Sequence, residues 1–248
     1  MRTEGDAFRE IMDAGRFLQD RQLVVATDGN LSIRLPGDII LITPSGRSLG
    51  EMGPDDLCKI HLDGRVFPGN LLSPSSEVPM HLAAYRARSD IQAVVHAHPP
   101  YCIAFSLAGL TLAGCLLPET VLDLGNIRTA EYFAPSSDTG VQIVAKELAF
   151  GNAFVLDRHG SLTVGPTLRE ALFRLERMER AAQITSLAIG LGGKELKQLS
   201  RQEVEELLAI KRAKGEIPPE VPGCNDCGAC LLPSAACIVP PPGAVSSL

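Results

Sequence analysis

Short apolar strands, tight turns and amphipathic helices follow one another along this chain in an irregular order, which narrows the choice of fold. Apolar residues alternate with polar ones or run together in the segments that we expect to be strands: residues 31–35, 38–42, 58–62, 93–98, 153–156 and 161–165. Apolar residues recur at helical spacing in the segments that we expect to be helices: residues 4–21, 77–88, 101–107, 138–150, 168–189 and 200–215. Pro36-Gly37 and Asp63-Gly64 are typical of hairpin turns, and no βαβ unit repeats. We therefore predict a three-layer α/β/α domain with a mixed, largely antiparallel sheet.

The composition indicates one folded domain followed by a segment of a different kind. Hydrophobic residues make up 45% of the 248 residues and charged residues 21%, as in ordinary globular proteins. Proline, glycine and serine dominate from Pro218 onward. We therefore expect a single domain over residues 1–217 and a tail rich in proline, glycine and cysteine over residues 218–248.

Charge and hydropathy argue against two classes of partner. The net charge of −6 offers no basic surface for nucleic acid. No run of about 18 apolar residues is present, so we expect no transmembrane helix and no membrane partner. The first residues are polar and lack the apolar core of a secretion signal. The expected location is the cytoplasm, where the cysteines of the domain would stay reduced.

Two histidines, His96 and His98, lie on the apolar segment that begins at Ala93. Residues i and i+2 of a strand point to the same side, so the two imidazoles would lie side by side, as two ligands of one metal ion do. The chain has five histidines, so this pairing uses a scarce residue. An H-x-H pattern is weak alone, and two histidines bonded to the backbone are an equal alternative.

Two further residues would complete a catalytic metal site, which has three protein ligands and one open position. His159 follows the strand at 153–156 and is the best third ligand, with a turn histidine as the alternative. Glu77 begins a predicted helix, where a carboxylate is electrostatically favoured; a simple acid of the first turn is the alternative. His81 would lie over Glu77 on the same helical face, and we interpret it as a packing or supporting residue rather than a ligand.

Small polar residues form three turns or helix starts that are typical of anion sites: Gly29-Asn30, Ser45-Gly46 and Ser75-Ser76. Turn amides, hydroxyl groups and a helix N-terminus can bind phosphate without a lysine. None of these pairs is specific by itself, because each occurs in many turns. Their combination with a histidine cluster favours a metal site that receives a phosphorylated substrate.

Together these segments resemble the class II aldolase/adducin family, specifically its fuculose-1-phosphate aldolase branch. The resemblance covers about residues 5–190, and five motifs carry it in the family's order: Gly29-Asn30-Leu31-Ser32, Ile42-Thr43-Pro44-Ser45-Gly46, Pro74-Ser75-Ser76-Glu77, Val94-Val95-His96-Ala97-His98 and Asp157-Arg158-His159-Gly160.

The resemblance implies a set of roles. His96, His98 and His159 would bind a divalent metal, usually zinc, with manganese or cobalt as alternatives, and Glu77 would be an acid/base that leaves the metal when substrate arrives. The phosphate of the substrate would be held by Gly29, Asn30, Ser45, Gly46, Ser75 and Ser76. A ketose 1-phosphate would be cleaved between C3 and C4 to dihydroxyacetone phosphate and an aldehyde, with Glu77 as the general acid. The family also implies a homotetramer with active sites between subunits.

One departure from the branch affects the substrate. The branch carries a proton-transferring tyrosine about 15 to 20 residues after its H-x-H, whereas this chain has Cys115-Leu116-Leu117-Pro118-Glu119 there. Glu119, Tyr132 or water are the candidate replacements. A 5-deoxy or 5-methylthio ketose phosphate is a further possible substrate. An epimerase or decarboxylase of the same fold, or a non-catalytic adducin-like module, remain alternative functions.

The tail carries a separate pattern of four cysteines. Cys224, Cys227, Cys230 and Cys237 resemble the ligands of an iron–sulfur cluster or another metal, although the last gap is longer than usual. A redox-active or unstructured tail is the alternative.

Overall fold

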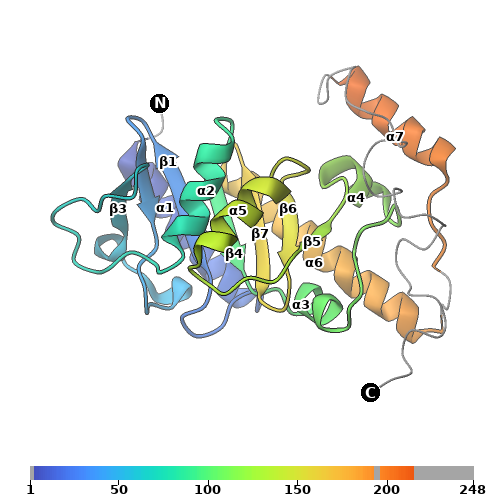
Figure 1. Ribbon diagram of the computed structural model, residues 1–248, viewed down its shortest axis with the longest axis horizontal. Coiled ribbons are helices and arrows are strands. Elements are labelled where there is room, and N and C mark those ends of the chain that lie inside the picture. Colours follow the sequence, from blue (N-terminus) through green and yellow to red (C-terminus); the bar gives the residue numbers. More distant parts are fainter. Residues whose placement is uncertain (1–2, 193–195, 215–248) are drawn as a thin grey trace.

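The computed structural model describes residues 3–192 and 196–214 of the chain (Figure 1). Its strands are β1 (Asn30–Leu35), β2 (Ile39–Ile42), β3 (Cys58–His61), β4 (Ala93–Ala97), β5 (Arg128–Ala130), β6 (Ala153–Leu156) and β7 (Gly160–Gly165). Its α-helices are α1 (Glu4–Asp20), α2 (Val78–Ala87), α3 (Pro100–Leu107), α4 (Pro118–Asp123), α5 (Asp138–Glu147), α6 (Leu168–Gly190) and α7 (Arg201–Ala213). Two short 3-10 helices, η1 (Leu49–Glu51) and η2 (Pro54–Asp56), lie between β2 and β3.

The seven strands form one mixed sheet in the order β3-β2-β1-β4-β7-β6-β5. Every neighbouring pair is antiparallel except β5 and β6, which are parallel. The β1–β2 hairpin turns through Gly37 and Asp38, both of which have positive φ, a conformation that glycine adopts without strain. The predicted mixed, largely antiparallel sheet is confirmed.

Helices cover both faces of the sheet, which confirms the three-layer α/β/α architecture (Figure 1). The side chains of α1, α3 and α6 share one buried cluster with inward residues of β1 and β4. Those of α2 and α5 share a second cluster on the other face. Strand β4 alternates between the two: Val95 and Ala97 lie in the first cluster, and Val94 lies in the second. By the same alternation, His96 points to the face that α2 covers.

The predicted helices and strands all form, with ends that differ by a few residues, whereas α4 and β5 were not predicted. The hairpin expected from the strand at 58–62 and the turn Asp63-Gly64 was only half right. β3 forms and pairs with β2, but beyond the turn the chain makes a single bridge between Ile60 and Val66. The predicted domain boundary at 217/218 and the four tail cysteines lie outside the described residues.

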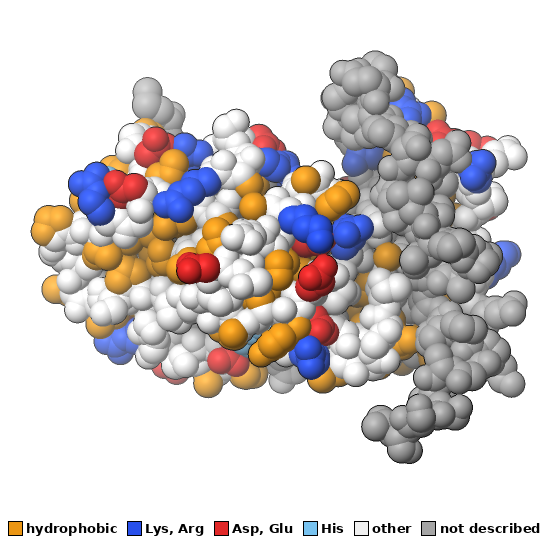
Figure 2. Space-filling model, viewed as in Figure 1, with side chains coloured by type: hydrophobic (Ala, Val, Ile, Leu, Met, Phe, Trp, Pro, Cys, Tyr) orange, Lys and Arg blue, Asp and Glu red, His pale blue; other side chains and the backbone are white. Residues whose placement is uncertain are grey.

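The surface and the helices give two further observations. On the face shown in Figure 2, acidic and basic side chains are interspersed over the described part of the chain. Among the described helices, none combines the length and the apolar character that a membrane span requires.

Candidate metal centre

The three predicted histidine ligands meet at one end of the sheet. His96 is in β4, His98 follows that strand, and His159 precedes β7. Because β4 and β7 are antiparallel neighbours with Ala97 opposite Ser161, the end of one strand lies beside the start of the other. The centroids of the three rings are 4.8 to 5.1 Å apart. One ligand atom of each histidine lies within 4.8 Å of those of the other two.

Gly160 allows this close approach. A Cβ atom at this position would lie 2.5 Å from the carbonyl oxygen of Ala97, 2.8 Å from Cδ2 of His98 and 3.2 Å from Cε1 of His96. Any other residue would push the start of β7 away from the two imidazoles. The glycine is therefore part of the construction of the site.

Hydrogen bonds orient two of the rings. Nδ1 of His96 is 2.9 Å from the carbonyl oxygen of Ser161, and Nδ1 of His98 is 3.3 Å from the carboxylate of Asp28. Both partners are acceptors, so each Nδ1 carries a proton, and in the metal-binding neutral form of the ring each Nε2 has a lone pair. The carboxylate–histidine arrangement at Asp28 is common behind metal ligands.

The atoms at the centre of the cluster are close enough to need a proton or a metal ion between them. Nε2 of His98 is 3.1 Å from Nε2 of His96, which is also 3.1 Å from Oε2 of Glu77. Lone pairs at this distance repel one another unless a proton or a metal ion lies between them. Two nitrogen ligands of a tetrahedral zinc ion are about 3.3 Å apart, so the observed separation fits such an ion.

Glu77 and His159 complete the cluster. Oε1 of Glu77 is 3.5 Å from Nε2 of His159, and the Glu77 side chain is only 13% exposed. Nδ1 of His159 is buried and has no hydrogen-bond partner among the described residues. Glu77 is the N-cap of α2, so the start of this helix brings the carboxylate to the histidines.

Burial keeps His98 and His159 neutral, and the surroundings of Glu77 keep its carboxylate ionised. Burial lowers the pKa of His98 and lowers the pKa of His159 to about 4. Burial alone would raise the pKa of Glu77, but the hydrogen bond from Asn30 and the contact with the His96 ring hold it well below its usual range. Neutral imidazole and ionised carboxylate are the forms that bind metals.

The three turns proposed for phosphate lie close to one another because buried Thr43 connects them. Thr43 Oγ1 accepts a hydrogen bond from the backbone of Leu31, and its carbonyl accepts one from the backbone of Ser75. Ser45 donates its backbone N–H to Ser73, beside a bridge between Pro44 and Pro74. The segments around residues 30, 45 and 75 therefore form one surface.

The residues proposed to bind phosphate differ in their exposure and in their existing hydrogen bonds. Ser45 and Gly46 are exposed, whereas Ser75 is buried and its hydroxyl accepts the backbone N–H of Glu77. Asn30 donates one Nδ2 hydrogen to Glu77, which leaves its second Nδ2 hydrogen for another acceptor.

Ser76 and Gly29 lie in the same loops as these candidates. The carbonyl of Ser76 accepts the hydroxyl of Ser136. Gly29 has a φ of 75° and packs against the carbonyl oxygen of His96, where a Cβ atom would come within 2.9 Å. Phosphate binding by this surface stays a prediction.

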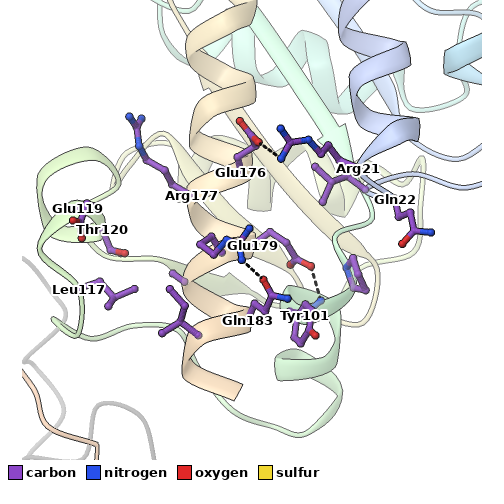
Figure 3. A pocket seen from close by; sticks show the side chains of 15 residues that line it. Arg21, Gln22, Tyr101, Leu117, Glu119, Thr120, Glu176, Arg177, Glu179 and Gln183 are labelled. Atoms are coloured by element: carbon purple, nitrogen blue, oxygen red, sulfur yellow. Dashed lines mark hydrogen bonds and ion pairs between the residues drawn. The ribbon is translucent and has the colours of Figure 1, made fainter. Parts of the chain in front are cut away.

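The structure separates the two candidate replacements for the missing tyrosine. Glu119 lines a cavity of about 780 Å³ beside α6 to which none of the three histidines contributes (Figure 3). Tyr132 is 56% exposed, and the guanidinium of Arg158, next to His159 in sequence, lies 4.6 Å from the centroid of its ring. Which of the two replaces the tyrosine stays a prediction.

Sequence reasoning missed two partners of the metal candidates. Asp28 directly precedes the Gly29-Asn30 turn, and a carboxylate beside that turn was the one signal that the sequence offered. Ser161 contributes its backbone carbonyl, so its side chain carried no information. Both contacts depend on the pairing of β4 with its neighbours, which a one-dimensional pattern does not specify.

Comparison with known proteins places these motifs in a known context. The family model for the class II aldolase and adducin N-terminal domain matches residues 9–186. An L-fuculose phosphate aldolase of Methanococcus maripaludis is 36% identical over 175 residues, covering 71% of this chain and 93% of the relative. A 3-oxo-tetronate 4-phosphate decarboxylase of Escherichia coli K12 is 35% identical over 198 residues, covering 78% and 91%. A solved L-fuculose 1-phosphate aldolase superimposes with a TM-score of 0.76 at 29% identity, covering 86% of this chain and 98% of that one.

Proposed function

This chain belongs to the class II aldolase and adducin family, and we propose that it is a metal-dependent lyase that breaks a carbon–carbon bond of a phosphorylated keto sugar. The observation that carries the proposal is the convergence of three imidazoles with an ionised carboxylate beside a surface of small polar turns. Our first candidate reaction is the cleavage of a ketose 1-phosphate to dihydroxyacetone phosphate and an aldehyde. The aldolase relatives support it.

His96, His98 and His159 would hold the metal, with zinc as the proposed ion because the ligands are nitrogen atoms. When bound, a divalent ion supplies a Lewis acid that stabilises the negative charge developing on the substrate carbonyl. Asp28 and the Ser161 carbonyl would keep two of the rings in their binding orientation. The turn around Ser45 and Gly46 would bind the phosphate and so fix the position of the sugar chain.

Glu77 would carry the proton in aldol cleavage. The C3–C4 bond breaks, its electron pair stays on C3, and the C4 hydroxyl loses its proton as C4 becomes an aldehyde. One proton must then be added to C3, so the reaction takes up no proton overall. Because Glu77 is ionised at rest, it can accept a proton before it donates one, so a carboxylate that reaches both positions could complete the transfer. Tyr132 or water would otherwise relay the hydroxyl proton.

Decarboxylation of a 3-oxo sugar acid phosphate is the second candidate, and one observation favours it. The chain has no tyrosine between Tyr101 and Tyr132, where the aldolase branch carries its proton-transferring residue. Loss of CO₂ leaves an electron pair on carbon but releases no hydroxyl proton, so that residue is not needed. The similarity to decarboxylases at 35% identity supports this reaction as well.

The second product separates the two reactions. Removing CO₂ from a 3-oxo-tetronate 4-phosphate and cleaving a ketose 1-phosphate would both leave dihydroxyacetone phosphate. We therefore propose to incubate the zinc-loaded protein with both substrate classes and to measure aldehyde, CO₂ and proton uptake. Aldehyde without net proton uptake identifies an aldolase; CO₂ with one proton consumed per turnover identifies a decarboxylase. Turnover of ribulose 5-phosphate without cleavage would instead identify an epimerase.

Several finer properties belong to this proposal. The presence of all three histidines favours an enzyme over a non-catalytic adducin-like module. We propose a cytoplasmic homotetramer with active sites between subunits, which light scattering would test. A second metal or an iron–sulfur cluster on the tail cysteines stays a prediction, to be tested by the iron and zinc content of protein purified without oxygen.

A further inference from the structure

A continuous chain of buried polar side chains leads from the interior of the domain to Glu77. The hydroxyl oxygen of Tyr85 is 2.7 Å from Oγ of Ser32, which is 2.7 Å from Nδ1 of His81. Nε2 of His81 is 2.5 Å from Oδ1 of Asn30, and Nδ2 of Asn30 is 2.7 Å from Oε2 of Glu77. His81 and Ser32 are fully buried, and Tyr85 and Asn30 are nearly so. Four consecutive hydrogen bonds thus end at the carboxylate beside the histidines.

The geometry of α2 and β1 creates this chain. Glu77, His81 and Tyr85 are spaced by four residues at and along α2, so each step covers about 6 Å on one helical face. Asn30 and Ser32 are spaced by two residues along β1, a step of about 6.6 Å on one face of the sheet. Because the spacing along the helix is close to the spacing along the strand, a side chain from β1 lies between each pair of side chains from the helix.

The donor and acceptor atoms of each pair determine the direction of every hydrogen bond. The NH₂ group of Asn30 donates to the Glu77 carboxylate, and its oxygen faces Nε2 of His81. His81 must then donate from Nε2. Burial lowers the pKa of His81 to about 3, so the ring is neutral and its Nδ1 accepts the hydrogen of Ser32. Ser32 has no second hydrogen, which makes Tyr85 the donor in the last pair.

We propose that His81, Ser32 and Tyr85 are positioning residues that act through Asn30 on the Glu77 carboxylate. All four hydrogen bonds point toward Glu77, and bonds aligned in this way polarise one another. Without the proton on Nε2 of His81, the Asn30 amide could rotate and present its oxygen to the carboxylate. The chain excludes that orientation and so holds Glu77 where the proposed proton transfer needs it.

The direct test is the protonation of the His81 ring in the full-length, zinc-loaded protein. Nitrogen-15 NMR with labelled histidine distinguishes a protonated from an unprotonated ring nitrogen, and His81→Phe assigns the signal. We expect a proton on Nε2 and none on Nδ1 at pH 7. A proton on Nδ1, or on both nitrogens, would overturn the proposal. This measurement is independent of whether the protein cleaves any sugar phosphate.

The kinetic test rests on the proposed function. His81→Phe keeps a buried ring but removes the donor, and we expect kcat to fall at least tenfold while zinc affinity and KM change less than threefold. Ser32→Ala is the second variant if His81→Phe does not fold, with an expected loss of three- to tenfold. Thr185→Val is the matched control, because it also deletes a buried hydroxyl hydrogen bond, here to the carbonyl of Ala181 within α6. This helix lies on the other face of the sheet from the chain that ends at Glu77.

The outcomes separate the proposals. Wild-type kcat in folded His81→Phe and Ser32→Ala, or an equal loss in Thr185→Val, would show that the chain is structural only. If the wild-type protein cleaves no substrate in the panel, the proposed function fails, and the NMR result alone decides the positioning chain.

Discussion

The replacement Gly160→Ala tests whether the close approach of β7 to β4 builds the metal site. The added Cβ atom would lie 2.8 Å from the ring of His98 and 2.5 Å from the carbonyl oxygen of Ala97. Ordinary contact begins near 3.4 Å, so the ring would have to move by about 0.6 Å unless the strand itself shifts. Metal–ligand distances tolerate only about 0.2 Å. We therefore expect the zinc affinity to fall at least tenfold, which is within the range of changes to the supporting residues of metal sites.

Overpacking should also reduce the free energy of unfolding by about 1–3 kcal/mol. Gly37→Ala is the matched control, because Gly37 lies in the β1–β2 turn with a φ of 79°, and an added Cβ atom would have no neighbour within 4 Å among the described residues. Its backbone strain should cost about 1–2 kcal/mol without touching the histidines. Zinc affinity would be measured by competition with a chromophoric chelator, and stability by urea denaturation of both variants. Wild-type zinc affinity in folded Gly160→Ala would refute this account of the site.

Three further predictions follow from the same geometry. Glu77→Gln should retain stoichiometric zinc but lose at least a hundredfold in kcat, as measured by product release, since it removes the proton carrier; a variant with near-normal turnover would exclude that role. Asp28→Ala should weaken zinc binding about tenfold by releasing His98, with an unchanged fold because Asp28 is 43% exposed; unchanged affinity in a competition assay would show that the contact is incidental. Because burial lowers the pKa of His81 to about 3, the unfolded chain takes up a proton below about pH 6.5 that the folded chain does not, so stability falls as the pH falls. From pH 7 to pH 5 the protonation of His81 in the unfolded chain lowers the free energy of unfolding by about 2 kcal/mol. Urea denaturation of chelator-treated protein should therefore show a loss over this pH range that is about 2 kcal/mol smaller in His81→Phe than in the wild type.

Much of the fold could be predicted because local patterns were strong. The alternation of apolar residues predicted β1 and β2, and Pro36-Gly37 predicted their turn. Strand β5 could not be predicted, since it has only three residues. It pairs in parallel with β6, and this pairing depends on the crossover through α5. Helix α4 has only six residues, too few to show a helical period.

The candidate site could also be predicted only in part from the sequence. The two-residue period of a strand placed His96 and His98 on one side, and the end of a strand suggested His159; the structure brings all three together. The buried chain behind Glu77 was only partly visible, because the four-residue spacing linked His81 to Glu77 but no pattern indicated that β1 supplies the intervening Asn30. Such contacts arise from the packing of a helix on a strand, which depends on the whole fold.

The central claim is that the three-histidine cluster binds one metal ion that the cleavage reaction requires. The most direct measurement is a titration of chelator-treated protein with zinc, in which bound metal and the rate of carbon–carbon bond cleavage are followed in the same sample. We predict no cleavage without metal and a rate that rises in proportion to bound zinc and levels off at one ion per chain, with neither binding nor activity in His96→Ala. Full activity of the metal-free protein, or an unchanged titration of His96→Ala, would contradict the account.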